Sequence, residues 1–353
     1  MASPLSRIGY GLGQGARVAW YVGHYLAVNR MRGPLVPPGE KPVSVQGKVP
    51  NWKGLVAGMR ALFERDWKNI DAGLYRAPDG LAAPAEAVAA SLRFFKDARK
   101  VDERRLSRRH SEVLTSEALS DELRARYPRY YLQNFHYQTG GWLSEESAKL
   151  YDTQVEVLFN GTAGAMRRQA LAPLAEALRG RDQRELALLD VACGTGRFLE
   201  DVAANYPRLN ITGLDLSPAY VAEARSRLAA RRNVSLIEAN AEKMPLAAAS
   251  QDAVTCIYLF HELPPKIRNV IAAEIARVLK PGGIAILVDA LQTGDTPDYD
   301  GLLEFFPIGF HEPYFNSYLA EDFKALFARH GLAQTDVALA FLSKIMVFRK
   351  GAA

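Results

Sequence analysis

The chain has 353 residues, of which 48% are hydrophobic and 24% are charged. This is the composition of an ordinary soluble globular protein, and it excludes collagen-like, intrinsically disordered and multi-span membrane proteins. The length fits about two domains. The 44 basic and 39 acidic residues leave a net charge of +5, which permits anionic partners without requiring them. Cys193 and Cys256 are too few for a disulfide-stapled secreted scaffold, so we expect a reducing, cytoplasmic location.

The start of the chain lacks the apolar run and small-residue cleavage site of a secretory signal, so we expect no export. Residues 16–28 are apolar and aromatic with flanking arginines, and they are shorter than the roughly 20 residues of a membrane span. A helix here either packs on the protein's own core, which we prefer, or lies peripherally on an anionic membrane. The preceding glycines follow no buried strand, so they predict a flexible lead-in and not a phosphate-binding loop. They are Gly9, Gly11, Gly13 and Gly15.

The next part of the chain alternates between linker and helix patterns. Residues 33–54 hold five prolines and four glycines, which predicts a linker or an extended wrap. Helical patterns follow at 55–71, 83–100 and 116–127. Residues 93–109 contain eight basic and three acidic residues, an excess equal to that of the whole chain. A nucleic acid or a membrane could bind such a face, but a solvated helix is its usual explanation.

From Leu186 onward, short apolar runs alternate with helical patterns. The expected strands and closing apolar segments are 186–192, 211–217, 234–238, 253–259, 284–289, 334–342 and 344–348. This alternation predicts an α/β fold with a doubly wound, Rossmann-like seven-stranded parallel sheet, whose ligands bind at the carboxyl ends of the strands. We therefore divide the chain into an N-terminal, mainly helical accessory or lid region, 1–145, and a core domain, 146–353.

The loop after the first predicted strand indicates a nucleoside ligand. Gly194 and Gly196 remove side chains where the backbone must approach a ligand, and the following helix offers free N–H groups. Asp215 lies 25 positions after Asp190, at the end of the next strand, where a carboxylate accepts both hydroxyls of a ribose. The third glycine of a dinucleotide loop is replaced by Leu199, so the spacing is wrong for NAD and favours S-adenosylmethionine.

Five motifs in the core domain occur in the order of a known family. They are DVACGTGRF (190–198), GLDLSPAYVAEAR (213–225), EANAEKMPL (238–246), QDAVTCIYLFHELP (251–264) and ARVLKPGG (276–283). By these motifs, residues 150–353 resemble class I S-adenosylmethionine-dependent methyltransferases. Within that class, the motifs are most similar to those of ubiquinone and menaquinone C-methyltransferases and related small-molecule enzymes. The resemblance implies that the protein is an enzyme and that S-adenosylmethionine is its cofactor.

The resemblance also implies a set of cofactor contacts. Asp190 orders the loop and faces the methionine ammonium, and Asp215 with Leu216 holds the ribose. The remaining contacts are Ala192, Gly194 and Gly196 at the nucleoside, Asn240, Ala241 and Glu242 around the adenine, and Tyr258 beside the methyl group. Two positions depart from the family pattern. Ala192 replaces the first glycine of the loop, and Asn240 replaces an aspartate, so an amide takes over a carboxylate contact to the adenine amino group.

Two histidines are candidate catalytic bases. His261 directly follows the fourth strand, and His311 lies in an aromatic insertion expected to close over the acceptor. An imidazole titrates near neutrality and can take a proton from a phenol or an activated carbon. The alternatives are that both residues are structural and that alignment alone carries methyl transfer. The histidines and cysteines show no ligand spacing, so the sequence predicts no metal site.

Two aromatic segments, 130–152 and 302–319, either build an acceptor pocket or attach the accessory region to the core. We expect methyl transfer to a carbon or oxygen of an apolar or aromatic small molecule, such as a quinone or isoprenoid. The alternatives are a protein or RNA methyltransferase, if the basic 93–109 segment borders the cleft, and a non-catalytic cofactor-binding assembly factor. Nucleic acid is a poor substrate candidate, because residues 261–264 replace the Asn-Pro-Pro-Tyr signature of base-modifying relatives. The oligomeric state is left open.

Overall fold

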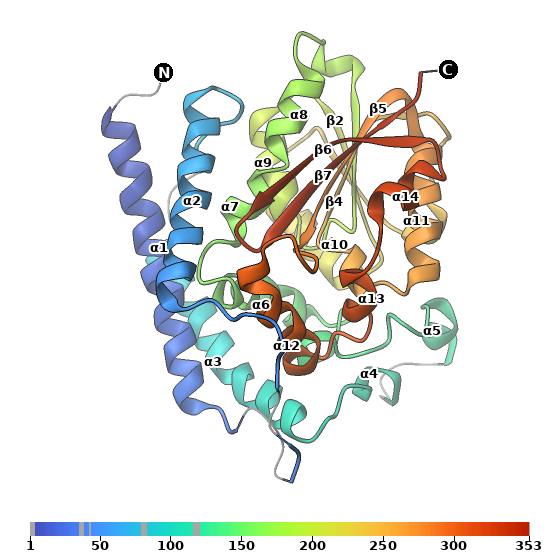
Figure 1. Ribbon diagram of the computed structural model, residues 1–353. Coiled ribbons are helices and arrows are strands. Elements are labelled where there is room, and N and C mark those ends of the chain that lie inside the picture. The colour runs from blue at the N-terminus through green and yellow to red at the C-terminus, as the bar shows by residue number, and fades with distance from the viewer. Residues whose placement is uncertain (1–3, 35–38, 42–43, 79–82, 116–120, 353) are drawn as a thin grey trace.

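The computed structural model describes residues 4–34, 39–41, 44–78, 83–115 and 121–352, and it places a helical region beside a central sheet with helices on both faces (Figure 1). The strands are β1 (Ala187–Val191), β2 (Asn210–Asp215), β3 (Val234–Glu238), β4 (Gln251–Ile257), β5 (Leu279–Ala290), β6 (Leu332–Ala340) and β7 (Ser343–Lys350). Their order in the sheet is β3-β2-β1-β4-β5-β7-β6. The predicted doubly wound, seven-stranded sheet is therefore confirmed.

The sheet is parallel, as predicted, except at one edge. Strands β1 to β5 run parallel, whereas β7 is antiparallel to both β5 and β6. Only Phe341 and Leu342 separate β6 from β7. A connection this short joins antiparallel strands only, because a parallel pair needs a crossover of a dozen or more residues.

Apolar layers on both faces of the sheet form the core. The covering helices are α8 (Leu171–Leu178), α9 (Arg197–Asn205), α10 (Pro218–Arg227), α11 (Pro265–Val278) and α14 (Phe323–Ala328). Leu188 of β1 joins the layer that contains α8 and α9, and Leu189 joins the opposite layer with α11 and α14. Successive residues of a strand point to opposite faces, so a strand covered on both sides must be apolar throughout. This explains the continuous apolar run in which β1 was predicted.

The accessory region has three long helices, α1 to α3, at the left and lower left of Figure 1, followed by short elements that run below the sheet toward the right. Its elements are α1 (Pro4–Met31), α2 (Trp52–Asp71), α3 (Pro84–Leu106), α4 (Glu112–Thr115), α5 (Asp121–Arg126) and η1 (Phe135–Tyr137). The helices predicted at 55–71 and 83–100 are confirmed as α2 and α3. Of the helix predicted at 116–127, residues 116–120 lie outside the described residues, and α5 covers most of the remainder.

The prediction of a flexible glycine lead-in was wrong. Gly9, Gly11, Gly13 and Gly15 all lie within α1, a single helix of 28 residues. Glycine in a helix costs about 0.5–1 kcal/mol relative to alanine. Here tertiary packing overrides that preference, because the hydroxyl of Tyr10 donates a hydrogen bond to Asp66 of α2 at 2.6 Å and its ring packs against a tryptophan of the same helix.

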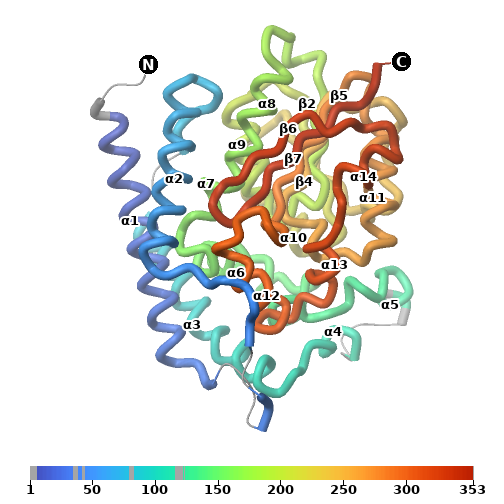
Figure 2. Tube along the Cα trace, in the orientation of Figure 1, coloured from blue at the N-terminus to red at the C-terminus, as the bar shows by residue number. Residues whose placement is uncertain are grey.

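Of the predicted extended wrap, residues 35–38 and 42–43 lie outside the described residues, and the wrap is present in the described part. Residues 44–50 run past α12 (Asp300–Phe310), as the tube in Figure 2 shows. The backbone N–H groups of Gln46 and Gly47 donate to the carboxylate of Glu304 at 2.6 and 2.9 Å. The wrap therefore joins the accessory region to the aromatic insertion that follows β5.

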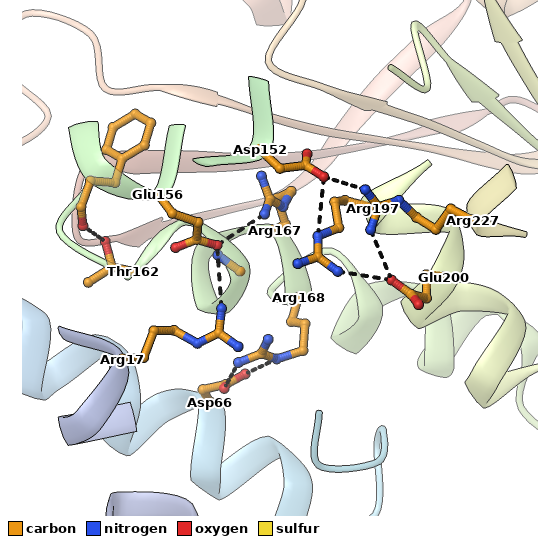
Figure 3. Close-up of polar contacts among 12 residues, drawn as sticks. Arg17, Asp66, Asp152, Glu156, Thr162, Arg167, Arg168, Arg197, Glu200 and Arg227 are labelled. Carbon is orange, nitrogen blue, oxygen red and sulfur yellow. Dashed lines mark hydrogen bonds and ion pairs between the residues drawn. The ribbon is translucent and has the colours of Figure 1, made fainter. Parts of the chain in front are cut away.

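Buried ion pairs also join the accessory helices to the core, through elements that connect the two (Figure 3). These elements are α6 (Glu145–Leu158) and α7 (Ala163–Arg168), whereas the short η2 (Gln183–Glu185) directly precedes β1. Asp66 of α2 lies 2.5 Å from Arg168 of α7, and Arg17 of α1 lies 3.8 Å from Glu156 of α6. Helix α6 begins next to the predicted boundary at residue 145, so these contacts attach α1 and α2 directly to the first helices after it.

The remaining elements are short and lie at the carboxyl edge of the sheet or in the insertion after β5. They are η3 (Ala241–Lys243), η4 (Phe260–Glu262), η5 (Pro297–Tyr299) and α13 (Phe315–Leu319). In the part of the chain that the structure describes, no helix is both long enough and apolar enough to cross a membrane.

Candidate active site

A cavity opens at the carboxyl ends of the parallel strands. The sheet order reverses between β1 and β4, and ligands of doubly wound sheets bind at such a reversal point. Most of the predicted cofactor contacts line this cavity: Ala192, Gly194, Asp215, Leu216, Asn240, Ala241 and Tyr258. The predicted lid segment supplies aromatic side chains to the same wall: Tyr130, Tyr131, Phe135, Trp142 and Tyr151. We call this space the cofactor cavity.

The glycine loop bends sharply between β1 and α9. Ala192, Gly194 and Gly196 have φ angles of 57°, 55° and 77°, in the left-handed region that favours glycine. A side chain at Gly194 would meet nothing within 4 Å, so this residue leaves space in the cavity, whereas one at Gly196 would press on Leu228 and the next helix. Gly196 therefore serves the cap of α9 and its packing. Ala192 pays about 1–2 kcal/mol of strain where the family has glycine.

Asp215 connects the glycine loop to the start of α10. Its Oδ2 atom accepts the backbone N–H of Gly194, and its Oδ1 atom accepts that of Ser217, both at 2.8 Å. Burial raises the pKa of Asp215, and the backbone hydrogen bonds oppose that shift. Each carboxylate oxygen has a second lone pair. The side chain is thus held rigidly in the cavity wall with acceptor capacity left for the hydroxyls of a ribose.

Asp190 lies behind the cavity wall, where it is buried between β1 and β4. Its Oδ1 atom accepts a hydrogen bond from the hydroxyl of Thr255 at 2.6 Å. Burial raises the pKa of Asp190 to about 7, the Thr255 bond opposing the shift and the charge of Asp215 adding to it. The two aspartates that the sequence singled out therefore influence each other, although only Asp215 faces the cavity.

The predicted adenine contacts form a small polar network. Asn240 caps η3 by accepting the backbone N–H of Glu242 at 2.9 Å, and its amide nitrogen donates to the Glu242 carboxylate at 3.1 Å. The hydroxyl of Tyr130 donates to the same carboxylate oxygen at 2.8 Å. Asn240 and Ala241 line the cavity, while the Glu242 carboxylate bonds to Asn240 and ties the lid to the core.

Neither candidate base is among the described residues that line the cofactor cavity. His261 is buried, and its Nδ1 atom lies 2.6 Å from Oδ1 of Asp289. Burial lowers the pKa of His261, but the charge and hydrogen bond of Asp289 outweigh it and raise the pKa to about 9. His311 ends α12, stacks on His110 with ring centroids 4.1 Å apart, and has its Nε2 atom 3.1 Å from Gln133. Burial lowers the pKa of His311 to about 4.

A second, larger cavity adjoins the first one. It has about 200 Å³ against about 110 Å³ for the cofactor cavity, and Tyr151 lines both. Its wall is mainly apolar and comes from α1, α3, α6 and α12: Val28, Phe94, Val155, Leu158, Phe305 and Phe310. The two predicted aromatic segments thus divide their roles, since 130–152 lines both cavities and 302–319 lines the second one. We call this second space the apolar cavity.

Three ionisable side chains meet between the two cavities, and the sequence did not predict their meeting. His136 lines the apolar cavity and Glu262 lines the cofactor cavity, while Glu312 is buried between them. One ligand atom from each lies within 4.8 Å of the other two. The three residues lie 126 and 50 positions apart in the chain. Only their polar character within otherwise aromatic segments could have drawn attention to them.

Comparison with known proteins defines the class of the core domain. Residues 188–283 match a family model described as a methyltransferase domain. The match covers the five motifs, and the sheet places their polar residues around one cavity. The match supports the resemblance of the core domain to class I S-adenosylmethionine-dependent methyltransferases.

The similar proteins of known identity include enzymes of quinone biosynthesis. A ubiquinone/menaquinone biosynthesis C-methyltransferase of Syntrophotalea carbinolica is 34% identical over 156 residues, which are 42% of this chain and 60% of that protein. A demethylmenaquinone methyltransferase of Deinococcus radiodurans is 35% identical over 143 residues, 40% of this chain and 56% of that protein. The match thus spans less than two thirds of these relatives. A solved structure, a SAM dependent methyltransferase from Aquifex aeolicus, is 16% identical, with a TM-score of 0.41 over 59% of this chain and 98% of that one.

Proposed function

We propose that this protein transfers the methyl group of S-adenosylmethionine to a carbon or oxygen of an apolar or aromatic small molecule of the quinone or isoprenoid kind. The observation that carries the proposal is the pair of adjoining cavities, one built from methyltransferase motifs and one lined by apolar side chains, with Tyr151 in the wall of both. The names of the similar proteins support an acceptor of this kind.

The residues of the cofactor cavity fit S-adenosylmethionine. The open space at Gly194 lets a ligand approach the backbone, and the fixed Asp215 carboxylate suits a ribose. Asn240 and Ala241 offer an amide and a small apolar surface to a base. When bound, the cofactor supplies a methyl group activated by its sulfonium. The protein's own contribution is then alignment and exclusion of water, which can supply much of the rate.

The apolar cavity suits the hydrocarbon part of the acceptor. It is bounded by α1 and α3 of the accessory region and by α12 of the insertion, so it exists only because these segments fold over the methyltransferase core. Burial of apolar surface contributes roughly 25 cal/mol per Å². An acceptor with a flat reactive head and an apolar tail would place the head near Tyr151 and the tail between the helices.

We also propose that α1 contacts a membrane in which such an acceptor dissolves. One side of the helix packs on the protein through His24, whose ring stacks on Phe95 of α3 at 5.0 Å. Large apolar side chains along the helix are also exposed: Ile8, Leu12, Trp20, Leu26 and Met31. The packed side agrees with the interpretation that we prefer, and the exposed side chains support the membrane proposal. Sedimentation of the full chain with anionic liposomes at low salt tests the proposal, and a protein that stays in the supernatant refutes it.

The alternative of an RNA or protein acceptor has less support. The sequence argument required the basic 93–109 segment to border the cleft, and part of it does, since Val101 and Arg105 line the apolar cavity. Several of its arginines, however, pair with acidic side chains of the protein, as in Arg104 with Glu112 at 2.5 Å and Arg108 with Glu40 at 2.6 Å. A solvated, internally paired helix explains this segment better than a nucleic-acid interface does.

The test of the proposed function is cofactor binding by Asp215 variants, measured by titration calorimetry. Asp215→Ala should weaken S-adenosylmethionine binding by about 1.5–3 kcal/mol, because a charged hydrogen-bond acceptor is lost. Asp215→Asn keeps one acceptor oxygen and should lose less. The matched control is Asp182→Ala, an exposed aspartate far from the cavity. Unchanged affinity in Asp215→Ala refutes the assignment, and binding without methyl transfer to any quinol would favour an assembly factor.

A further inference from the structure

The cluster of His136, Glu262 and Glu312 has the composition of a metal site. It offers one imidazole nitrogen and two carboxylates, a set that suits divalent cations such as Mn²⁺, Co²⁺ or Zn²⁺. The three side chains come from separate elements: η1, η4 and the turn after α12. In the described part of the chain, their ligand atoms converge within 4.8 Å. Two ligands opposite each other on a metal at about 2.1 Å are about 4.2 Å apart, so a small rotation of one side chain completes the site.

The Glu312 carboxylate has an unpartnered oxygen inside this cluster. The side chain is fully buried, and its Oε2 atom makes no hydrogen bond with any described residue. Oε1 nevertheless lies 3.0 Å from Nε2 of His136. Neighbouring ligands on an octahedral metal at about 2.1 Å are about 3.0 Å apart. A buried carboxylate with an unpartnered oxygen is costly unless it is paired or bound to a metal, so the Oε2 atom points to a cation at this place.

The surroundings of the cluster favour tight and directed binding. The rings of Phe306 and Phe310 lie edge-on to the His136 ring, with centroids 5.9 and 6.2 Å away, and they limit the access of water. The backbone of His136 has a φ of 54°, a left-handed conformation that the fold imposes on a non-glycine residue. This conformation fixes the direction in which the imidazole points. Strain of this kind persists where the surrounding structure holds the residue firmly in place.

We propose that His136, Glu262 and Glu312 bind one divalent cation, which holds an oxygen of the acceptor between the apolar cavity and the cofactor cavity. Three protein ligands leave coordination positions open, as in catalytic metal sites. His136 faces the apolar cavity and Glu262 faces the cofactor cavity, so the open positions lie where an acceptor's head must pass. The cation turns a hydroxyl of the acceptor toward the methyl group and favours its ionised form, the proton passing to solvent. The role toward the acceptor rests on the proposed function, but the metal site does not.

Metal binding is tested first, on the full chain after dialysis against a chelator. Titration with MnCl₂, followed by electron paramagnetic resonance of free Mn²⁺, should show one site per chain. Glu312→Gln and His136→Gln should each weaken binding by about tenfold or more, since even indirect partners of a metal matter by about 10–100-fold. The matched controls are Glu145→Gln and His330→Gln, which lie away from the cluster. Glu312→Gln keeps nearly the same side-chain shape, so circular dichroism should show it folded.

The role toward the acceptor is tested on the Mn²⁺-loaded protein. A naphthoquinol added without oxygen should displace water from the bound ion and lower its enhancement of water proton relaxation. No Mn²⁺ or Zn²⁺ binding by the wild type, or equal binding by Glu312→Gln, overturns the metal site. Binding without any effect of the quinol overturns the acceptor role. Calorimetry with S-adenosylmethionine on the same samples keeps the two proposals apart, because its failure would refute the proposed function and leave the metal result standing.

Discussion

The buried pair of Asp66 and Arg168 should be among the most sensitive contacts between the accessory helices and the core. Asp66 is fully buried on α2, and Arg168 of α7 reaches it with Nη2 at 2.5 Å and Nε at 3.3 Å (Figure 3). The hydroxyls of Tyr10 and Tyr75 donate to the same carboxylate at 2.6 and 2.7 Å. Asp66→Ala therefore removes the acceptor of one buried guanidinium and of two hydroxyls.

The expected loss is large because the remaining groups stay buried. Breaking a buried ion pair by removing one partner costs about 3–5 kcal/mol. The two hydroxyls left without acceptors each add about 1 kcal/mol or more, so Asp66→Ala should lower the free energy of unfolding by about 5–7 kcal/mol. The double variant Asp66→Leu with Arg168→Met should recover at least half of this loss, because it leaves no unpaired charge.

Urea unfolding followed by circular dichroism measures the effect, and limited proteolysis shows which part opens first. The control is Glu145→Ala, which removes one partner of the exposed pair with Lys149 and should cost no more than about 0.5 kcal/mol. Because the chain has an accessory region and a core, a separate transition at low urea in Asp66→Ala is expected. If Asp66→Ala is no less stable than Glu145→Ala, the pair does not hold the two parts together.

The other predictions concern three residues near the cofactor cavity. The pKa of Asp190 is raised from 3.8 in the unfolded chain to about 7 in the folded one, so the folded state keeps a proton that the unfolded state has lost. Its contribution to stability is complete below about pH 4 and disappears as the pH rises through 7. The resulting decline in the free energy of unfolding is about 4 kcal/mol at most. Asp190→Asn should abolish this decline, which urea unfolding at pH 5 and at pH 8 measures. His311→Ala should keep kcat within about threefold, since this ring is outside the cavity wall. His261 also lies outside that wall, but its Nε2 atom is 3.9 Å from Glu262 in the wall. His261→Ala should therefore lose most of kcat with cofactor affinity retained if His261 is the base or positions Glu262, and a normal kcat in both variants leaves alignment to carry the reaction.

The order of motifs along the sequence was enough to predict the core domain. Apolar runs of strand length, each followed by a helix pattern, determine a doubly wound sheet because buried parallel strands need helices on both faces. The separation of Asp190 from Asp215 then predicted their positions at adjacent strand ends, since each strand ends on the same edge of the sheet. This local signal was sufficient for the cofactor cavity, and the contacts of Asp215 to Gly194 and Ser217 agree with it.

Other features could be decided only by tertiary structure. Local propensity predicts that the glycines of α1 are flexible, but the packing of Tyr10 on α2 stabilises them in a helix. The cluster of His136, Glu262 and Glu312 has no sequence spacing to recognise, because three separate segments bring its ligands together. The apolar cavity likewise needs α1, α3, α6 and α12 to pack around it. Helix and strand periodicity records which side of an element is buried, but it does not record which distant element covers that side. Long-range packing therefore decided where the acceptor and a cation could bind, whereas the sequence alone determined the cofactor and the sheet that holds it.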